Sequence, residues 1–243
     1  MIESILLSAV RVSTFEGSAP LTNASGFFFE RGDRLFLVTS RHVIFDEPTK
    51  HFPDRLEIEV HTDPDNAAKT SGFSIPLYRE RESTWRQGKD SAGEIDVAAI
   101  EIEREALPES ATFRCFTPAH LLDAQETIEI GTSVLILGFP LGFHDALHRI
   151  PIARHGIVSS SFGLRFQGEG YFLTDARTHR GSSGAPVVLR VAQPEEALGG
   201  LPWKLLGVHS SRVDVKTREA GKDEALGLNT AWYADILMTL TKS

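Results

Sequence analysis

Short apolar runs separated by turn residues fill this chain, and they constrain its fold more than any other feature. Apolar and polar residues alternate in Leu56–Val60 and in Ile95–Ile102, which is typical of strands with one buried face. Glycine, proline and aspartate recur between the runs, where they favour turns. With 243 residues, 41% of them hydrophobic, the chain is predicted to form one globular all-β unit of two small barrels.

A helix is expected only near the C-terminal end of the chain. Residues Thr230–Met238 have helical spacing, and Asn229 precedes them as an N-cap residue. We place the first barrel at residues 1–120 and the second barrel, together with the terminal helix, at residues 127–243. The segment near Pro118–Gln125 is the predicted linker between the two barrels.

One serine lies in a setting that suits a nucleophile. The segment Gly181–Pro186 reads Gly-Ser-Ser-Gly-Ala-Pro and places Ser183 between two glycines, just after the strand-like run Tyr171–Thr174. Glycine adopts backbone conformations that other residues avoid, and it lets a substrate carbonyl approach backbone N–H groups. An isolated Gly-x-Ser-Gly is often only a turn, so the motif needs support from other residues.

A serine nucleophile needs a base and an orienting carboxylate elsewhere in the chain. His42 follows the apolar run Leu35–Thr39, and Asp96 opens the apolar run Val97–Ile100. A carboxylate at the start of a buried strand is costly unless it is paired, and a histidine N–H is a suitable partner. Either residue alone could serve packing, so the hypothesis of a catalytic site depends on all three residues together.

The order of these residues separates two kinds of serine hydrolase. The nucleophile elbow of α/β-hydrolases requires an acid and then a histidine after the serine, on a strand–turn–helix unit. Of the nine histidines only His209 follows Ser183, and all later aspartates come after His209. The residues after the serine motif, Pro186–Leu189, favour a strand rather than a helix. The order His, Asp, Ser instead matches the chymotrypsin arrangement.

At this point the chain resembles a trypsin-like (chymotrypsin-fold) serine protease of the bacterial HtrA-like type, without a PDZ domain. The blocks that carry the resemblance are Ser25–Phe29 with Leu37–Ile44, Glu94–Ile100, Val134–Gly142 with His155–Ser160, and Thr174–Ala176 leading to the serine motif. The resemblance implies two packed antiparallel six-stranded Greek-key barrels and a C-terminal helix. It also implies a serine endopeptidase that acts through an acyl-enzyme.

The same resemblance assigns roles to individual residues. Ser183 would be the nucleophile, His42 the general base and Asp96 the residue that orients the imidazole. The backbone N–H groups of Gly181 and Ser183 would form the oxyanion hole. His42 and Asp96 would come from the first barrel and Ser183 from the second.

A second resemblance concerns substrate specificity. The fragment Gly207–Val213 is similar to the pocket strand of staphylococcal exfoliative toxins and glutamyl endopeptidases, where a histidine and a hydroxyl hold a glutamate side chain. By this likeness Thr178, His209, Ser210 and Arg177 are candidate substrate-binding residues, with a preference for Glu or Asp before the scissile bond. Hydrogen bonds from a hydroxyl and an imidazole to a carboxylate are charge-assisted. The alternative is that His209 is only a packed strand histidine.

Composition limits the partners. The formal net charge of −8 and the isoelectric point near 5.6 argue against nucleic-acid binding driven by overall charge. Cys115 is the single cysteine, so no internal disulfide can form. Residues Ile5–Val10 resemble a first strand more than an export signal, and no stretch is long enough to span a membrane. The charged stretch Lys216–Glu224 is predicted to be a solvated loop.

We therefore expect a protein or peptide substrate, no cofactor and no metal, and a cytoplasmic location, with secretion as the alternative. His144, His148 and His155 have a spacing that could suggest a metal site, but no tight ligand set completes it. The alternative function is a catalytically silent or partner-gated module that binds peptides, controlled by a regulatory protein partner. The presence of all three candidate catalytic residues favours the enzyme.

Overall fold

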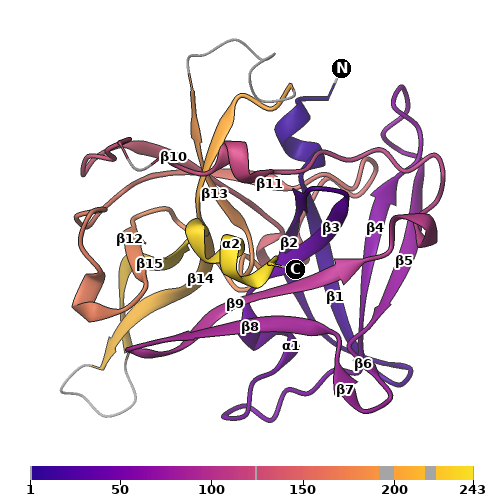
Figure 1. Ribbon diagram of the computed structural model, residues 1–243, viewed down its shortest axis with the longest axis horizontal. Coiled ribbons are helices and arrows are strands. Elements are labelled where there is room, and N and C mark those ends of the chain that lie inside the picture. The colour runs from indigo at the N-terminus through magenta and orange to yellow at the C-terminus, as the bar shows by residue number, and fades with distance from the viewer. Residues whose placement is uncertain (1, 124, 192–199, 217–222, 243) are drawn as a thin grey trace.

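The computed structural model describes residues 2–242 except 124, 192–199 and 217–222. Regular structure in this part of the chain is mostly antiparallel β-strand, arranged as two main sheets (Figure 1). The strands of one sheet come from residues 9–102 and those of the other from residues 133–233. The expected all-β class is confirmed, and each half of the chain builds its own sheet.

The first sheet has seven strands rather than the expected six. The additional strand is β8 (Trp85–Asp90), which lies at the edge of the sheet and pairs with β9 (Gly93–Ile102). None of its residues is fully buried. A separate two-stranded hairpin consists of β6 (Tyr78–Arg79) and β7 (Glu82–Ser83). In spatial order the seven strands are β5 (Thr70–Pro76), β4 (Arg55–His61), β1 (Ala9–Glu16), β2 (Ala19–Arg31), β3 (Arg34–Thr39), β9 (Gly93–Ile102) and β8 (Trp85–Asp90).

The second sheet has six strands and carries the serine motif on the loop between two of them. Residues 217–222, in the stretch expected as a solvated loop, lie outside the described residues. In spatial order the strands are β11 (Ile152–Ile157), β10 (Ser133–Gly138), β13 (Pro186–Arg190), β14 (Trp203–Lys216), β15 (Asp223–Tyr233) and β12 (Tyr171–Thr174).

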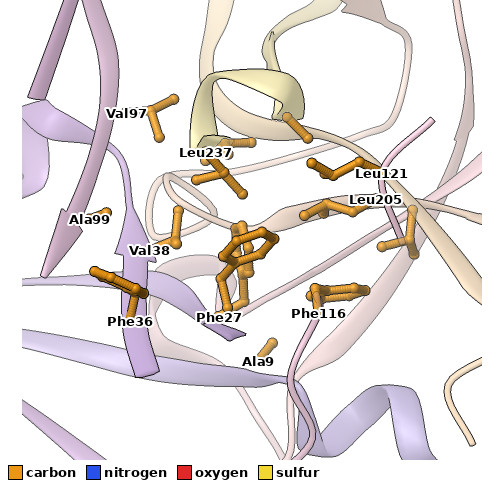
Figure 2. Packing of buried hydrophobic residues seen from close by; sticks show 14 of the residues in the cluster. Ala9, Phe27, Phe36, Val38, Val97, Ala99, Phe116, Leu121, Leu205 and Leu237 are labelled. Carbon is orange, nitrogen blue, oxygen red and sulfur yellow. The ribbon is translucent and has the colours of Figure 1, made fainter. Parts of the chain in front are cut away.

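Buried apolar side chains form three clusters, which explains how the two sheets pack. One cluster belongs to the first sheet and another to the second. The third combines residues from both halves, and Figure 2 shows Phe27 and Val38 of the first sheet in the same cluster as Leu205 and Leu237 of the second half. This cluster fixes the two sheets against each other, which is required of any site built from both.

Strand β2 shows how the sequence achieves this packing. Phe27, Phe28 and Phe29 are all fully buried. Successive side chains of a strand point to opposite faces. Accordingly, Phe28 packs inside the first cluster while Phe27 and Phe29 pack into the cluster between the sheets.

The helix expected at Thr230–Met238 is wrong in its first half. Strand β15 continues through Tyr233, and only then do a 3₁₀ turn at Ala234–Ile236 and the helix α2 (Leu237–Leu240) follow. The physical reason is strand pairing: Trp232 lies opposite Tyr171 of β12 on one side and Val208 of β14 on the other. Tertiary pairing overrides the local helical spacing.

The N-terminal segment also differs from the expectation. Residues Ser4–Leu7 form a 3₁₀ turn, and β1 begins only at Ala9. Ser8 closes this turn, because its backbone N–H and its hydroxyl both donate to the carbonyl of Ile5. The other short helical segments in the described part of the chain are α1 (Arg41–Ile44) and the 3₁₀ turns Arg104–Ala106, Pro118–His120, Pro140–Gly142 and Phe166–Gly168.

Among the described residues, no helix has the length and hydropathy needed to cross a bilayer.

Candidate active site

His42 lies on the one-turn helix α1, directly after β3. Val43 and Ile44 of the same turn are buried in the core of the first sheet, which holds the turn in place. The His42 side chain stays 36% exposed. Its Nδ1 lies 2.7 Å from Oδ2 of Asp96 on β9, and its backbone N–H donates to Oδ1 of the same carboxylate at 2.8 Å. Asp96 therefore holds both the ring and the backbone of His42.

This contact sets the proton positions on His42. A carboxylate accepts a hydrogen from Nδ1, so Nε2 of the neutral ring is left as the basic nitrogen. Burial acts to lower the pKa of His42, but the hydrogen bond and charge of Asp96, together with the charge of Asp46, outweigh it. The net result is a raised pKa. His42 is thus a stronger base than a free imidazole.

Ser210 connects the acid to the serine motif. Its hydroxyl donates to Asp96 Oδ2 at 2.5 Å, and its carbonyl accepts the hydroxyl of Ser183 at 3.0 Å. Within the described part of the chain, no hydrogen bond joins the Ser183 hydroxyl to the His42 ring. Asp96 is therefore hydrogen-bonded to both His42 and Ser210, and Ser183 is linked to this pair only through the Ser210 carbonyl among the described residues.

The loop before Ser183 forms a tight turn with two free donors. The N–H of Ser182 bonds to the carbonyl of His179 at 3.1 Å, and Gly181 has φ +91°, the value that the third position of a type II turn requires. The Arg180 carbonyl accepts the Leu141 N–H at 2.5 Å. Because a trans peptide points its C=O and N–H in opposite directions, the Gly181 N–H faces away from Leu141.

The donors of this turn are available to a ligand. Considering only residues that the structure describes, neither the Gly181 N–H nor the Ser183 N–H has a hydrogen-bond acceptor. A Cβ at position 181 would lie 2.5 Å from the carbonyl oxygen of Phe139, so only glycine fits. Two unpaired N–H groups next to a serine hydroxyl are the arrangement that stabilises an oxyanion.

Ser25, which the sequence-based site did not include, connects the first sheet to this turn. It is fully buried on β2. Its N–H donates to the Ser183 carbonyl at 2.9 Å, and its hydroxyl donates to the Gly181 carbonyl at 2.8 Å. The same hydroxyl accepts the Phe139 N–H at 3.0 Å. The only signal in the sequence is that Ser25 and Gly26 precede the apolar run Phe27–Phe29, which does not reveal these partners.

The hydroxyl of Thr178, a candidate pocket residue, is already hydrogen-bonded within the protein. The residue is 4% exposed, and its hydroxyl lies 2.5 Å from Oδ1 of Asn229. The Asn229 amide in turn donates to the Ala176 carbonyl at 2.6 Å. Asn229 is therefore not a helix cap, as the sequence suggested, but a link between β15 and the segment before the serine motif.

His209 is nearly sealed, at 2% exposure, and its Nδ1 has no hydrogen-bond partner among the described residues. Burial, assisted by the charge of His42 and opposed by that of Asp96, lowers its pKa to about 4. The ring is therefore neutral at neutral pH. Arg177, by contrast, is exposed and forms no ion pair in the described part of the chain.

The histidines considered as a metal site do not gather into one. His144 bonds to the Gly142 carbonyl, His148 bonds to Asp145, and His155 lies on β11. No group of three or more His, Cys, Asp or Glu side chains within the described residues is arranged to hold a metal ion.

Comparisons with known proteins place this geometry in a family. The trypsin-like peptidase domain matches residues 24–192, which is more than half of the chain. No curated protein matches significantly in sequence. Among solved structures, the serine endoprotease from Yersinia pestis is similar, with 17% sequence identity and a TM-score of 0.56.

That match covers 96% of this chain but only 61% of the Yersinia protein, and it shows a shared chymotrypsin-like fold. A family match over most of the sequence and an independent match of the whole fold agree, so the chain belongs to the trypsin-like peptidase family.

Proposed function

We propose that this protein is a serine endopeptidase with Ser183 as nucleophile, His42 as general base and Asp96 as the orienting acid. The observation that carries the proposal is the hydrogen-bonded pair of His42 and Asp96, placed on one sheet, together with two unpaired N–H groups beside Ser183 on the other. The proposed domain division, residues 1–120 and 127–243, puts the site between the two domains.

Strand β14 offers a place for the substrate backbone. Its pairing with β13 ends at Val208 opposite Pro186, while β15 covers its other edge. Among the residues that the structure describes, the continuation of β14 past Ser210 therefore has a free edge, along which an extended peptide can add as a strand. The peptide segment before the scissile bond is expected to lie there.

The chemistry follows from the positions of donors and acceptors. The Ser183 oxygen attacks the carbonyl carbon while His42 Nε2 takes the hydroxyl proton, and the oxygen of the tetrahedral intermediate accepts hydrogen bonds from Gly181 and Ser183 N–H. His42 then returns the proton to the leaving amine, which breaks the C–N bond and leaves an ester on Ser183. Water hydrolyses the ester by the same steps. In comparable sites one oxyanion donor is worth about 10²–10³ in kcat.

A preference for glutamate before the scissile bond is supported by His209. A neutral imidazole with an unpartnered ring nitrogen is an incomplete hydrogen-bonding group, and buried polar groups normally have partners. A substrate carboxylate that accepts from the ring would raise the pKa of His209. Thr178 supports this less directly, because its hydroxyl already bonds to Asn229.

One observation favours control of activity. The Ser183 hydroxyl rests on the Ser210 carbonyl rather than on His42, so it must rotate before His42 can take its proton. The second candidate function, a module that is silent until a partner or substrate engages it, predicts that this resting state persists in the isolated protein.

A fluorophosphonate probe separates the two functions. The enzyme should be labelled at Ser183, detected by intact mass, and Ser183→Ala should not be labelled. A folded wild-type protein that stays unlabelled contradicts the enzyme and favours the gated module.

A second experiment tests the glutamate pocket with peptides that differ only by Glu or Gln before the cut. The ratio of kcat/KM for the Glu peptide to kcat/KM for the Gln peptide should be lower in His209→Gln than in wild type. An unchanged ratio would remove the glutamate hypothesis.

A further inference from the structure

The loop between β10 and β11 exposes an unusual amount of apolar surface. Leu141, Phe143 and Leu147 are 73%, 68% and 65% exposed. Large apolar side chains that cluster at the surface often mark a binding site, whereas isolated ones do not. Here the three lie within seven residues of one another.

The backbone of this loop contacts the turn at residues 179–182, which carries the Gly181 N–H and is called the oxyanion turn below. The Leu141 N–H donates to the Arg180 carbonyl at 2.5 Å, and a Cβ on Gly181 would lie 3.0 Å from the Leu141 nitrogen. The backbone of Leu141 therefore lies next to Gly181, whose N–H would hold the scissile carbonyl, and Phe143 follows two residues later. No other exposed apolar cluster within the described residues has a backbone bond to this turn.

The far end of the loop is fixed to the first sheet. The His148 carbonyl accepts a hydrogen bond from Nε2 of His61 on β4 at 2.7 Å, and Arg149 pairs with Glu59 at 3.8 Å. The loop thus spans from the oxyanion turn on one sheet to β4 on the other. A surface anchored at both ends is preorganised for binding.

Leu141 itself has a strained backbone. Its φ is +55°, a value that costs energy for a side chain with a Cβ. The strain is tolerated because the Leu141 N–H holds the Arg180 carbonyl, and it accompanies a leucine side chain that is largely exposed. Strain of this kind tends to persist at functional sites.

The direction of the substrate identifies the occupant. If the segment before the scissile bond lies on the free edge of β14, the leaving segment must depart on the other side of Gly181. Phe139, Leu141 and Gly142 are the residues nearest to the missing Cβ of Gly181, so they border the turn from which that segment departs. The exposed side chains of Leu141 and Phe143 therefore begin next to this turn, where the leaving segment can reach them.

We propose that Leu141 and Phe143 bind a large apolar side chain within the first three residues after the scissile bond of the substrate. The inference rests on the proposed peptidase function and adds a requirement on the leaving side of the cut. An extended peptide advances about 3.3 Å per residue, so three residues reach about 10 Å beyond the carbonyl.

The test uses two kinds of substrate. Peptides carry Leu, Phe or Ser at each of the three positions after the cut, and a methylamide with the same acyl segment carries no side chain there. We expect wild-type protein to favour the best apolar peptide over its serine counterpart by roughly tenfold in kcat/KM, the scale of one apolar contact. Phe143→Ser should reduce this ratio to about twofold while leaving turnover of the methylamide unchanged.

Two further variants serve as controls. Phe143→Leu should restore most of the preference, because it keeps an apolar side chain. Ile130→Ser removes an equally exposed apolar residue, 68% accessible, that lies outside the loop and should change neither ratio.

Each outcome bears on a different claim. If neither the peptides nor the methylamide is turned over, the peptidase function fails and this inference fails with it. If either substrate is turned over but the apolar preference is absent in wild type, or survives in Phe143→Ser, the inference alone is overturned. If Phe143→Ser instead abolishes self-association in sedimentation without changing the preference, a second copy of the chain covers this surface and the inference is wrong.

Discussion

Replacing Ser25 with alanine removes one hydroxyl that forms two hydrogen bonds, one to the Gly181 carbonyl and one from the Phe139 N–H. The Phe139 N–H, in a residue that is 1% exposed, loses its acceptor. An unsatisfied buried donor costs about 1–3 kcal/mol. The Gly181 carbonyl, which is half-buried, loses a donor that water can replace, at about 0.5–1.5 kcal/mol. We therefore expect Ser25→Ala to lower the free energy of unfolding by about 2–4 kcal/mol.

The same change should also lower activity beyond its effect on stability. Gly181 supplies a proposed oxyanion donor, and its carbonyl is held by the Ser25 hydroxyl. Complete loss of such a donor costs about 10²–10³ in kcat, so a donor that is loosened rather than removed should cost at least about tenfold. Because an oxyanion donor acts on charge that develops only toward the transition state, the loss should appear in kcat more than in KM.

Ser8→Ala is the matched control for this experiment. Ser8 is also fully buried and its hydroxyl also bonds to a carbonyl, that of Ile5 at 2.7 Å, but it lies outside the site. Urea unfolding should show a loss of only about 1 kcal/mol, since the Ile5 carbonyl keeps the Ser8 N–H as a donor. If both variants lose equal stability and Ser25→Ala keeps its kcat under conditions where it is folded, the positioning role of Ser25 is refuted.

Four other groups give predictions that single measurements can check. Asp96→Asn should lower kcat by about 10⁴ with little change in KM, as expected when the wrong imidazole tautomer is held, and steady-state rates near wild type would contradict the role of Asp96. In wild-type protein, kcat/KM should fall on the acid side with a midpoint above 6.5, the ordinary pKa of histidine, because the base must be unprotonated. Burial lowers the pKa of His42, but Asp96 raises it by more. His209, whose folded pKa is about 4, binds fewer protons when folded than when unfolded, so stability should fall as pH drops from 6.5 to 4. The loss is at most about 3 kcal/mol, and urea midpoints of His209→Gln should be flatter over this range. Burial, reinforced by the charge of Glu30, raises the pKa of Cys115 to about 12, so iodoacetamide should label it at pH 8 far more slowly in native than in urea-unfolded protein.

The sequence predicts most of the strands because their signal is local. Alternation in Leu56–Val60 and Ile95–Ile102 corresponds to β4 and β9, each with a buried face. Two elements escaped this logic. The residues Trp85–Asp90 alternate poorly because β8 is an edge strand with little burial, and Thr230–Tyr233 became strand only because β12 and β14 lie on either side of it.

The candidate site divides in the same way between local and distant information. His42, Asp96 and Ser183 are visible in the sequence because each follows or opens an apolar run and their order matches a known arrangement. The roles of Ser25 and Ser210 are not visible, because they depend on partners 156 and 114 residues away. A buried serine is chemically ordinary until the residue it bonds to is known.

These two serines also explain why the site depends on both sheets. Ser25 of the first sheet bonds to the turn on the second that holds Ser183, and Ser210 of the second sheet bonds to Asp96 of the first. Hydrogen bonds that cross in both directions resist sliding and separation of the sheets, and the apolar cluster between the sheets excludes the water that would compete with them. The relative position of the proposed base His42 and the proposed nucleophile Ser183 is therefore set by the packing of both sheets rather than by any single loop.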